Sequence, residues 1–344
     1  MERVKVKASV EYEVLISGGL LEKSGELSRE VIPVCKVALI SDDTVWKLYG
    51  DMVEKSFSDA GYDVSQYVFP SGEQSKNTNV LIDILNFLGN EGITRSDAIV
   101  ALGGGVCGDM AGFSASCFLR GIRFIQIPTT FLAAIDSSVG GKTAVDFNGV
   151  KNIVGTFYQP KKVLIDPDLL KTLPPRQISN GLAEAVKMAL TSDAELFGIF
   201  ENKDIANSID EIIIRSLNIK KSVVEQDEKE SGLRKILNFG HTVGHGIESS
   251  KGELYHGECV ALGMIPMCGE NIRQRVIAVL KKCDLYRIEE YDWQRIESAA
   301  FHDKKADGDA VTVIEVNEIG LFEMKTVGCS DVIDRAKKVL EGLK

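Results

Sequence analysis

The chain has 344 residues, of which 44% are hydrophobic and 26% are charged, and its formal net charge is −10. The length predicts two domains, and the composition is that of a soluble globular protein. The acidic balance argues against a nucleic-acid partner, and the absence of a long apolar run or signal-peptide core argues against a membrane partner. Seven scattered cysteines without a CxxC pair indicate reduced thiols, so we expect a cytoplasmic protein.

The first half of the chain alternates strand and helix patterns. We expect strands over 4–16, 36–43 and 122–128, a buried strand that runs into glycines in DAIVALGGG (97–105), helices over 45–60, 80–90 and 109–119, and a strand and loop in YDVSQYVFPSGEQSK. This alternation predicts an α/β N-terminal domain with a largely parallel sheet that helices cover on both faces.

Helical periodicity dominates from TLPPRQ (172–177) to about residue 300. Ser179 or Asn180 is a candidate N-cap for a helix over 181–190. VTVIEV and GLFEMKTV predict a small hairpin near the end of the chain. The two prolines at 174 and 175 indicate a domain boundary, so we expect an α/β domain over 1–173 and a mostly α-helical C-terminal domain over 174–344.

Glycines 103, 104, 105 and 108 satisfy G-x-G-x-x-G between a predicted strand and a predicted helix. The backbone amides of such a turn can bind a pyrophosphate at the helix N-terminus. Tight strand-to-helix turns also use glycine for steric reasons alone. Asp42, after an earlier strand, is a candidate ligand for ribose hydroxyls, although it could instead cap the next helix.

The stretch DSSVGGKT (136–143) invites a P-loop interpretation, which fails because Asp136 occupies the position of the first glycine. A nucleoside-triphosphate kinase is therefore disfavoured. Gly140, Gly141 and Lys142 could still bind phosphate, with Lys151 and Arg120 as further cations. The alternative for each cation is an ordinary solvated surface charge.

Three of the four histidines lie between residues 241 and 256. Arg234, Asn238, His241 and His245 are spaced by four, three and four residues, which predicts one face of a helix. Such a polar stripe is costly to bury without partners, so it would face a polar cavity or an ion. Glu184 could form a surface ion pair with Lys187, or it could bind a metal together with two imidazoles, as in catalytic zinc sites.

These motifs together resemble the 3-dehydroquinate synthases, a family of sugar phosphate cyclases. The resemblance covers roughly residues 70–264 and is carried by SGEQSK, ALGGGVCGDMAGF, RGIRFIQIPTTFLAAIDSSVGGKTAVD, GVKNIVGTFYQP, TLPPRQISNGLAEAVK, VVEQDEKESGLRKILNFGHTVGHGIE and YHGECVALGM. It implies a dehydroquinate synthase-like fold with NAD on the first domain and metal and substrate sites on the second. It also implies one divalent metal, usually Zn²⁺ with Co²⁺ as an alternative, and a homodimer.

The resemblance assigns roles residue by residue. The implied metal ligands are Glu184, His241 and His256. The implied NAD contacts are Asp42, Glu73, Lys76, Gly104, Gly105, Val106, Asp109, Thr129, Thr130, Lys142, Lys151 and Thr172. The implied substrate contacts are Arg120, Asp136, Lys142, Lys151, Asn152, Asn180, Lys187, Lys220, Arg234, Asn238 and Lys304. The implied catalytic residues are Glu230, His245, Lys142, Arg234 and Asn238.

Two positions depart from the family pattern. Thr44 stands where relatives often have Asn, two residues after the ribose-binding Asp. Residues 265–300 show little of the pattern, so Lys305 competes with Lys304 for the substrate contact.

The implied enzyme is a phosphorus–oxygen lyase of the shikimate pathway, which leads to aromatic amino acids. It converts 3-deoxy-D-arabino-heptulosonate 7-phosphate to 3-dehydroquinate and phosphate by transient oxidation with NAD, phosphate elimination, reduction, ring opening and aldol closure. The alternatives are another sugar phosphate cyclase, a metal-dependent polyol dehydrogenase that shares the GGG and PTT motifs, and a binding protein that has lost catalysis.

Overall fold

The computed structural model describes residues 1–250, 253–302 and 310–344. The chain forms two compact units, Met1–Leu173 and Pro174–Lys344. The division falls at the two consecutive prolines where the sequence predicts a boundary. Within the described ranges, no helix is both long enough and apolar enough to span a membrane.

The first unit is built on a seven-stranded sheet with the strand order β1-β2-β9-β6-β5-β3-β4. Every neighbouring pair is parallel except β1 and β2, which are antiparallel, so the prediction of a largely parallel sheet is confirmed. The strands are β1 (Glu2–Lys7), β2 (Glu11–Ile16), β3 (Lys36–Asp42), β4 (Asp63–Phe69), β5 (Ala98–Gly103), β6 (Arg123–Pro128) and β9 (Lys162–Ile165).

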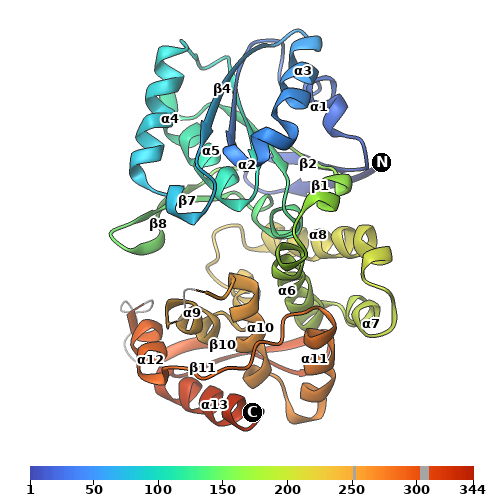
Figure 1. The fold of residues 1–344 in the computed structure, drawn as a ribbon, viewed down its shortest axis with the longest axis vertical. Helices are drawn as coiled ribbons and strands as arrows, with labels where there is room; N and C mark the ends of the chain where they lie inside the picture. Colours follow the sequence, from blue (N-terminus) through green and yellow to red (C-terminus); the bar gives the residue numbers. More distant parts are fainter. Residues whose placement is uncertain (251–252, 303–309) are drawn as a thin grey trace. The chain divides into compact units, whose positions relative to one another are not determined.

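Helices cover both faces of this sheet (Figure 1). Successive residues of a strand point to opposite faces, and β3 shows the consequence. Leu39 packs with Phe57 of α3, whereas the next residue, Ile40, packs with Met110 of α5. The helices are α1 (Ser24–Ser28) and α3 (Asp51–Asp59) on one face, and α4 (Thr78–Asn90) and α5 (Gly105–Cys117) on the other.

The order of the strands reverses beside β3. The chain passes from β3 to β4 on one side and then returns to β5 on the other side of β3. Ligands of open α/β sheets bind outside the carboxyl ends of the strands at such a reversal. Asp42 ends β3 and Gly103 ends β5, so the fold places the predicted nucleotide-binding residues at this position.

Two features of the first unit differ from the expected elements. The helix expected over 45–60 is a short α2 (Asp43–Val45), a π-helical turn (Trp46–Gly50) and then α3. The stretch after Gly141 forms an antiparallel hairpin of β7 (Lys142–Phe147) and β8 (Val150–Phe157), separate from the main sheet. The register of this hairpin is irregular between Val145 and Phe147, and every residue of β8 is exposed. The alternation of buried and exposed residues that predicts a strand is therefore weak in this stretch.

The second unit is mainly helical, and its small hairpin is where the sequence predicts it (Figure 1). The mostly helical character of this unit is therefore confirmed. Its elements are α6 (Pro175–Ser192), α7 (Ala194–Asn202), α8 (Ile209–Gln226), α9 (His241–Ser250), α10 (His256–Met267), α11 (Glu270–Lys282), α12 (Trp293–His302), β10 (Ala310–Glu318), β11 (Leu321–Gly328) and α13 (Cys329–Glu341).

The start of α6 differs from the prediction. The helix begins at Pro175, because a proline in the first turn has no backbone N–H that needs a helical partner. Ser179 and Asn180 are buried inside the helix, so the prediction that either residue is its N-cap is wrong.

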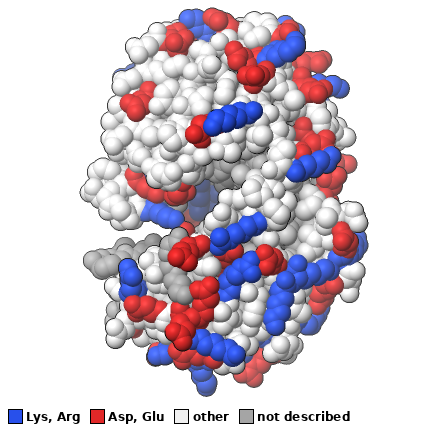
Figure 2. All heavy atoms as spheres, viewed as in Figure 1, with Lys and Arg blue, Asp and Glu red and all other residues white. Residues whose placement is uncertain are grey.

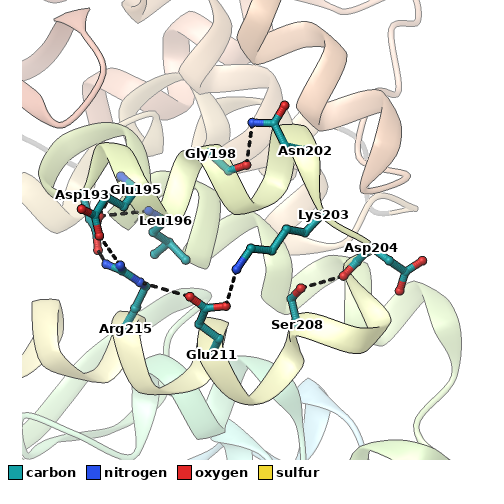
Figure 3. Close-up of polar contacts among 10 residues, drawn as sticks. All are labelled: Asp193, Glu195, Leu196, Gly198, Asn202, Lys203, Asp204, Ser208, Glu211 and Arg215. Carbon is teal, nitrogen blue, oxygen red and sulfur yellow. Dashed lines mark hydrogen bonds and ion pairs between the residues drawn. The ribbon is translucent and has the colours of Figure 1, made fainter.

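A polar network fixes α7 against α8 (Figure 3). Asp193 caps α7 by accepting a hydrogen bond from the Leu196 amide at 2.9 Å. Arg215 of α8 donates to the same carboxylate at 2.8 Å, and Lys203 pairs with Glu211 at 2.8 Å. These contacts orient α8, which carries the predicted substrate residue Lys220.

On the face drawn in Figure 2, Lys and Arg side chains are interspersed with Asp and Glu side chains over both units. A duplex-binding surface would instead concentrate positive charge on one face. The mixed surface drawn there fits the expectation that a small molecule is the ligand.

Candidate active site

Close contacts between helix backbones bring the predicted metal ligands together. A Cβ atom on Gly257 would lie 2.1 Å from the carbonyl oxygen of Asn180, and one on Gly263 would lie 2.0 Å from that of Gly240. Glycine at these two positions therefore lets α10 approach both α6 and the start of α9. As a result Glu184 of α6 faces His241 and His256, the first residues of α9 and α10.

The three predicted ligands converge on one point. Glu184 Oε1 lies 3.8 Å from His241 Nε2 and 3.7 Å from His256 Nε2. This oxygen is buried and has no hydrogen-bond partner among the residues that the structure describes. Two ligand atoms of a tetrahedral Zn²⁺ are about 3.4 Å apart. An unsatisfied carboxylate oxygen at nearly this distance from two imidazole nitrogens fits a divalent metal.

His245 belongs to the same cluster. Its ring centroid lies 5.2 Å from that of His241 and 5.7 Å from that of His256, and the potential ligand atoms of the three histidines lie within 4.8 Å of one another. His245 is the exposed member of the three. This position allows either metal binding or the predicted proton transfer, and the variants proposed below distinguish the two roles.

Lys187 is the counter-ion of Glu184. Its ammonium group pairs with Glu184 Oε2, and both side chains are almost completely buried, so the alternative of a surface ion pair is wrong. Burial acts to raise the pKa of Glu184, but Lys187 and the imidazoles outweigh it and hold that pKa well below its usual value. The carboxylate is therefore ionised and able to bind a cation.

The two imidazoles differ in their electrostatics. Burial, with Lys187 as the next cause, holds the pKa of His241 well below its usual value, so its ring is neutral. Burial also acts to lower the pKa of His256, but the carboxylates of Glu184 and Glu248 outweigh it and raise that pKa to about 9. A metal therefore competes with a proton at His256.

The second ring nitrogen of each imidazole also has a partner. His241 Nδ1 lies 3.2 Å from the carbonyl oxygen of Phe239, and His256 Nδ1 lies 3.1 Å from Glu248 Oε2. Glu248 is absent from the residues predicted from the sequence. A signal was present, because Glu248 follows His241 by seven residues and therefore shares its face of α9.

Arg176 and Glu258 fix the first turn of α10. Arg176 donates from Nε to Glu258 Oε1 at 2.8 Å and from a terminal nitrogen to Oε2 at 2.7 Å. Glu258 also accepts the backbone N–H of Tyr255 at 2.8 Å. Asn180 Oδ1 accepts the N–H of Gly257 at 2.6 Å. Arg176, Asn180 and Glu184 lie at four-residue intervals on α6, so one helix face holds both α10 and the metal cluster.

The predicted substrate residues Arg234 and Asn238 lie on a 3₁₀ helix, Leu233–Asn238, and α9 begins afterwards at His241. The prediction of one continuous helical stripe is therefore wrong. Asn238 donates to Glu230 Oε1 at 2.9 Å, which joins two of the predicted catalytic residues. Glu230 has a positive φ of 60°, in the left-handed region that few non-glycine residues adopt.

Asp227 organises this loop and was not predicted. Its carboxylate accepts the backbone N–H groups of Ser231, Gly232 and Arg234 at 2.9, 2.7 and 3.0 Å, and also the Ser231 hydroxyl. These hydrogen bonds, the one from Arg234 first, hold the pKa of Asp227 well below its usual value. The carboxylate thus stays ionised and fixes the backbone that presents Glu230 and Arg234.

Cationic side chains are buried in this unit to an unusual degree. Lys187 and Arg234 are each 1% exposed, and Lys220 is 6% exposed. Lysine and arginine are rarely buried to this degree without anionic partners. Lys187 has Glu184 as its partner, and Arg234 donates to the carbonyl oxygen of Glu228.

The glycine turn of the first unit combines close steric contacts with a helix N-terminus. A Cβ on Gly104 would lie 2.9 Å from Thr130, and one on Gly108 would lie 2.8 Å from Gln126, so steric fit requires glycine there. Gly104 is also the N-cap of α5, and α5 is long enough for its first amides to attract an anion. Gly105 and Val106 form the first turn of that helix.

Asp42 caps the next helix, as its alternative interpretation predicts. Its Oδ1 accepts the backbone N–H groups of Thr44 and Val45 at 3.0 and 2.9 Å. Thr129, the residue after β6, donates its N–H to the Gly103 carbonyl at 3.0 Å. Its buried hydroxyl has no hydrogen-bond partner within the described part of the chain, which leaves a polar group for a ligand beside the glycine turn.

Lys76 joins several predicted NAD and substrate residues. Its ammonium group lies 2.5 Å from Asp109 Oδ2 and donates to Asn152 Oδ1 at 2.5 Å. Burial raises the pKa of Asp109 to about 6, although Lys76 opposes the shift. Glu73 begins the 3₁₀ turn that precedes Lys76. The cluster therefore combines a buried cation with a carboxylate that titrates near neutral pH.

Other predicted residues of the first unit are more dispersed. Thr172 donates to the Leu169 carbonyl at 3.0 Å and contacts the Tyr49 hydroxyl. Asp136 lies in a π-helical turn, Ala133–Ser137, and Lys142 and Lys151 lie on β7 and β8.

Arg120 lies at the opposite end of α5 from the glycine turn. It closes the short turn Phe118–Arg120 after α5, whose 13 residues make the helix about 20 Å long. The structure therefore does not bring Arg120 to the glycine turn of its own chain. The remaining predicted substrate residue, Lys304, and its competitor Lys305 lie outside the described residues.

Comparison with known proteins identifies the family. The 3-dehydroquinate synthase N-terminal model matches residues 66–180, and the 3-dehydroquinate synthase C-terminal model matches residues 181–306. A 3-dehydroquinate synthase of Enterococcus faecalis is 43% identical over 337 residues, which cover 93% of this chain and 94% of the relative. One of Acetivibrio thermocellus is 46% identical over 318 residues, which cover 87% and 88%.

Solved structures agree with this placement. A 2-deoxy-scyllo-inosose synthase in complex with carbaglucose-6-phosphate, NAD⁺ and Co²⁺ is 26% identical, with a TM-score of 0.88 over 98% of this chain and 100% of that one. A 2-epi-5-epi-valiolone synthase of Streptomyces hygroscopicus with NAD⁺ and Zn²⁺ has the same identity and TM-score over 100% of both chains. An iron-containing alcohol dehydrogenase, 15% identical with a TM-score of 0.67, over 98% of this chain and 99% of that one, shares the fold alone. The chain therefore belongs to the 3-dehydroquinate synthase family.

Proposed function

We propose that the chain converts 3-deoxy-D-arabino-heptulosonate 7-phosphate to 3-dehydroquinate and phosphate. The observation that carries the proposal is the unsatisfied Glu184 oxygen beside His241 and His256, next to the buried cations Lys187 and Arg234. A substrate with one carboxylate and one phosphate can form charge-assisted hydrogen bonds with cationic side chains of this kind. Curated relatives that share 43% or more of the aligned residues carry the name of this activity.

The proposed ligands of the divalent metal, Zn²⁺ or Co²⁺, are Glu184, His241 and His256. The proposed site of NAD is the strand reversal of the first unit, at Asp42, the Gly103–Gly105 turn and the Lys76–Asp109 pair. Support comes from the relatives solved with NAD⁺ and Zn²⁺ or Co²⁺, and from the buried Thr129 hydroxyl beside the turn.

When bound, the metal would supply Lewis-acid polarisation of a substrate hydroxyl, and NAD would supply reversible hydride transfer. The protein then has to bind anions, orient the sugar and move protons. Lys187, Lys220 and Arg234 neutralise the substrate's negative groups, and Glu230 holds Asn238 in a fixed orientation. His245, the exposed imidazole of the cluster, is placed to carry a proton to solvent.

The decisive test is incubation of the purified protein with the heptulosonate phosphate, a catalytic amount of NAD and Zn²⁺. We expect phosphate and dehydroquinate in equal amounts without net NADH. Net NADH formation with a polyol would support a dehydrogenase. Phosphate release from a different sugar phosphate alone would support another cyclase, and no turnover of any sugar phosphate with NAD still bound would support a binding protein.

Histidine variants test the ligand set. His256→Ala is expected to lose both the metal and turnover while the protein remains folded. His245→Gln is expected to keep one metal per chain and to lose activity, because His245 moves protons in this proposal. Full metal content in the first variant would contradict the ligand assignment, and metal loss in the second would make His245 a ligand.

We also propose that the protein is a homodimer, and a pair of variants tests whether Arg120 binds substrate in its own chain or in the partner. The Arg120→Met and His256→Ala variants are each expected to be inactive. A mixture refolded into heterodimers should regain activity if Arg120 serves the partner, since one site then has both residues. If Arg120 served its own chain, no mixture would be active.

We place the enzyme in the cytoplasm, where the seven cysteines remain reduced. All seven are free thiols in the structure, and five of them are buried. Cell fractionation followed by thiol counting is expected to find the protein in the cytoplasmic fraction with no disulfide.

A further inference from the structure

Glu248 lies behind the predicted metal site, on the side of the His256 ring that faces away from Glu184. His256 Nε2 is 3.7 Å from Glu184 Oε1, whereas Nδ1 is 3.1 Å from Glu248 Oε2. The Glu248 side chain is 18% exposed and the His256 side chain is 30% exposed. The imidazole is thus held between two carboxylates, one on each ring nitrogen.

This arrangement determines which nitrogen of His256 is available to a cation. An ionised carboxylate can only accept a hydrogen bond, so Nδ1 must carry the hydrogen that Glu248 accepts. In the neutral ring the lone pair is then on Nε2, which faces Glu184 Oε1. Two acceptors that face each other at this distance repel each other unless a cation lies between them.

The charges around the histidine cluster indicate a second role for Glu248. Lys187 is paired with Glu184, so the charge of that ligand is offset before any metal binds. Behind the His241 ring, Nδ1 lies 3.2 Å from the neutral carbonyl oxygen of Phe239. Glu248 therefore adds a second carboxylate to the cluster, on the far side of the His256 ring from the Lys187–Glu184 pair.

We infer that Glu248 is a positioning residue that fixes the tautomer of His256 and raises the affinity of the site for a divalent metal. The inference rests on the proposed ligand set. Carboxylates that accept a hydrogen bond from a metal-binding histidine typically contribute a factor of about 10–100 in metal affinity. Glu248 is placed for this role because it shares the face of α9 that carries His241 and His245.

Zn²⁺ affinity tests the inference without substrate or NAD. Metal-free wild type, Glu248→Gln and Glu248→Ala are titrated with Zn²⁺ against a chromophoric chelator. We expect Glu248→Gln to bind about 10-fold more weakly, because the amide oxygen still accepts from Nδ1 but carries no charge. Glu248→Ala should bind up to about 100-fold more weakly, because it loses both the acceptor and the charge.

Glu253→Gln is the matched control, because Glu253 is an exposed carboxylate three residues before His256. It is expected to bind Zn²⁺ as tightly as wild type. Nitrogen NMR of the histidine rings supplies a second readout. In wild type His256 should be protonated at Nδ1 and bind the metal through Nε2, and in Glu248→Ala this preference should be lost.

Unchanged Zn²⁺ affinity in both Glu248 variants would overturn the inference. If Glu248→Ala does not fold, the nearly isosteric Glu248→Gln decides the question. The experiments distinguish failure of the Glu248 inference from failure of the proposed metal-ligand set. Metal loss in His256→Ala together with full affinity in Glu248→Gln would reject Glu248 alone, whereas metal retention in His256→Ala would reject the ligand set.

Discussion

Gly257→Ala is expected to separate α10 from α6 and thereby weaken the metal site. The added Cβ would lie 2.1 Å from the carbonyl oxygen of Asn180, and ordinary contact begins at 3.4 Å. The first turn of α10 would therefore have to move by about 1.3 Å, the difference between these values. That turn begins with His256, so the shift acts directly on the distance to Glu184.

Both stability and metal affinity should respond. Overpacking of this size costs about 1–3 kcal/mol. Stretching the hydrogen bond from the Gly257 N–H to Asn180 Oδ1, now 2.6 Å, costs about 1 kcal/mol more. We expect the metal-free variant to lose about 2–4 kcal/mol of unfolding free energy. We also expect Zn²⁺ binding to weaken at least about 10-fold, since a ligand is displaced by about 1 Å.

Denaturant unfolding of metal-free protein and Zn²⁺ titration measure these two quantities. Gly198→Ala is the control, because a Cβ on Gly198, inside α7, meets no atom within 4 Å. It should leave Zn²⁺ affinity unchanged and stabilise the protein by about 0.5–1 kcal/mol. If Gly257→Ala matched this control in both measurements, the close approach of α10 to α6 would have no role in assembling the site.

Arg176→Met should lower the free energy of unfolding by about 2 kcal/mol at neutral pH. This is less than the loss of a fully buried ion pair, because Arg176 is 42% exposed and Arg287 remains 3.5 Å from Glu258. Burial acts to raise the pKa of Glu258, but Arg176 outweighs it and the net pKa is lowered. The difference between variant and wild type should therefore be present above about pH 4.3 and disappear as the pH falls through the folded-state pKa. Thermal unfolding from pH 3 to 8 checks this, and a difference that grew toward acid would contradict it. Asp227→Asn should lower kcat/KM by at least about 10-fold and leave Zn²⁺ affinity unchanged, because it places an NH₂ group among the amide donors of residues 231–234. A variant with unchanged steady-state kinetics would show that this loop does not need the carboxylate.

Local patterns were sufficient to predict much of this fold. Apolar runs that end in turn residues located β3, β5 and β6, and alternating residues located the β10–β11 hairpin. The prolines at 174 and 175 mark the division between the two units because they restrict the backbone locally. The family resemblance, carried by contiguous stretches, indicated Glu184, His241 and His256 together.

Elements whose form depends on distant neighbours were predicted less well. A helix over 181–190 was expected, yet α6 begins at Pro175 and buries Asn180, because that side chain accepts the amide of Gly257 from another helix. Arg234 and His241 were placed on one helix, yet the chain turns between them at Gly240, whose φ is 78°.

The sequence by itself determined the alternation of elements, the domain boundary and the chemical types of the predicted site residues, because these depend on neighbours along the chain. Only the tertiary structure decided that Glu184 is a buried partner of two imidazoles rather than a surface charge, that Glu248 contacts His256, and that Asp227 binds the backbone before Arg234. Those properties depend on contacts between residues far apart in the sequence, such as α10 against α6, where a single glycine sets the distance.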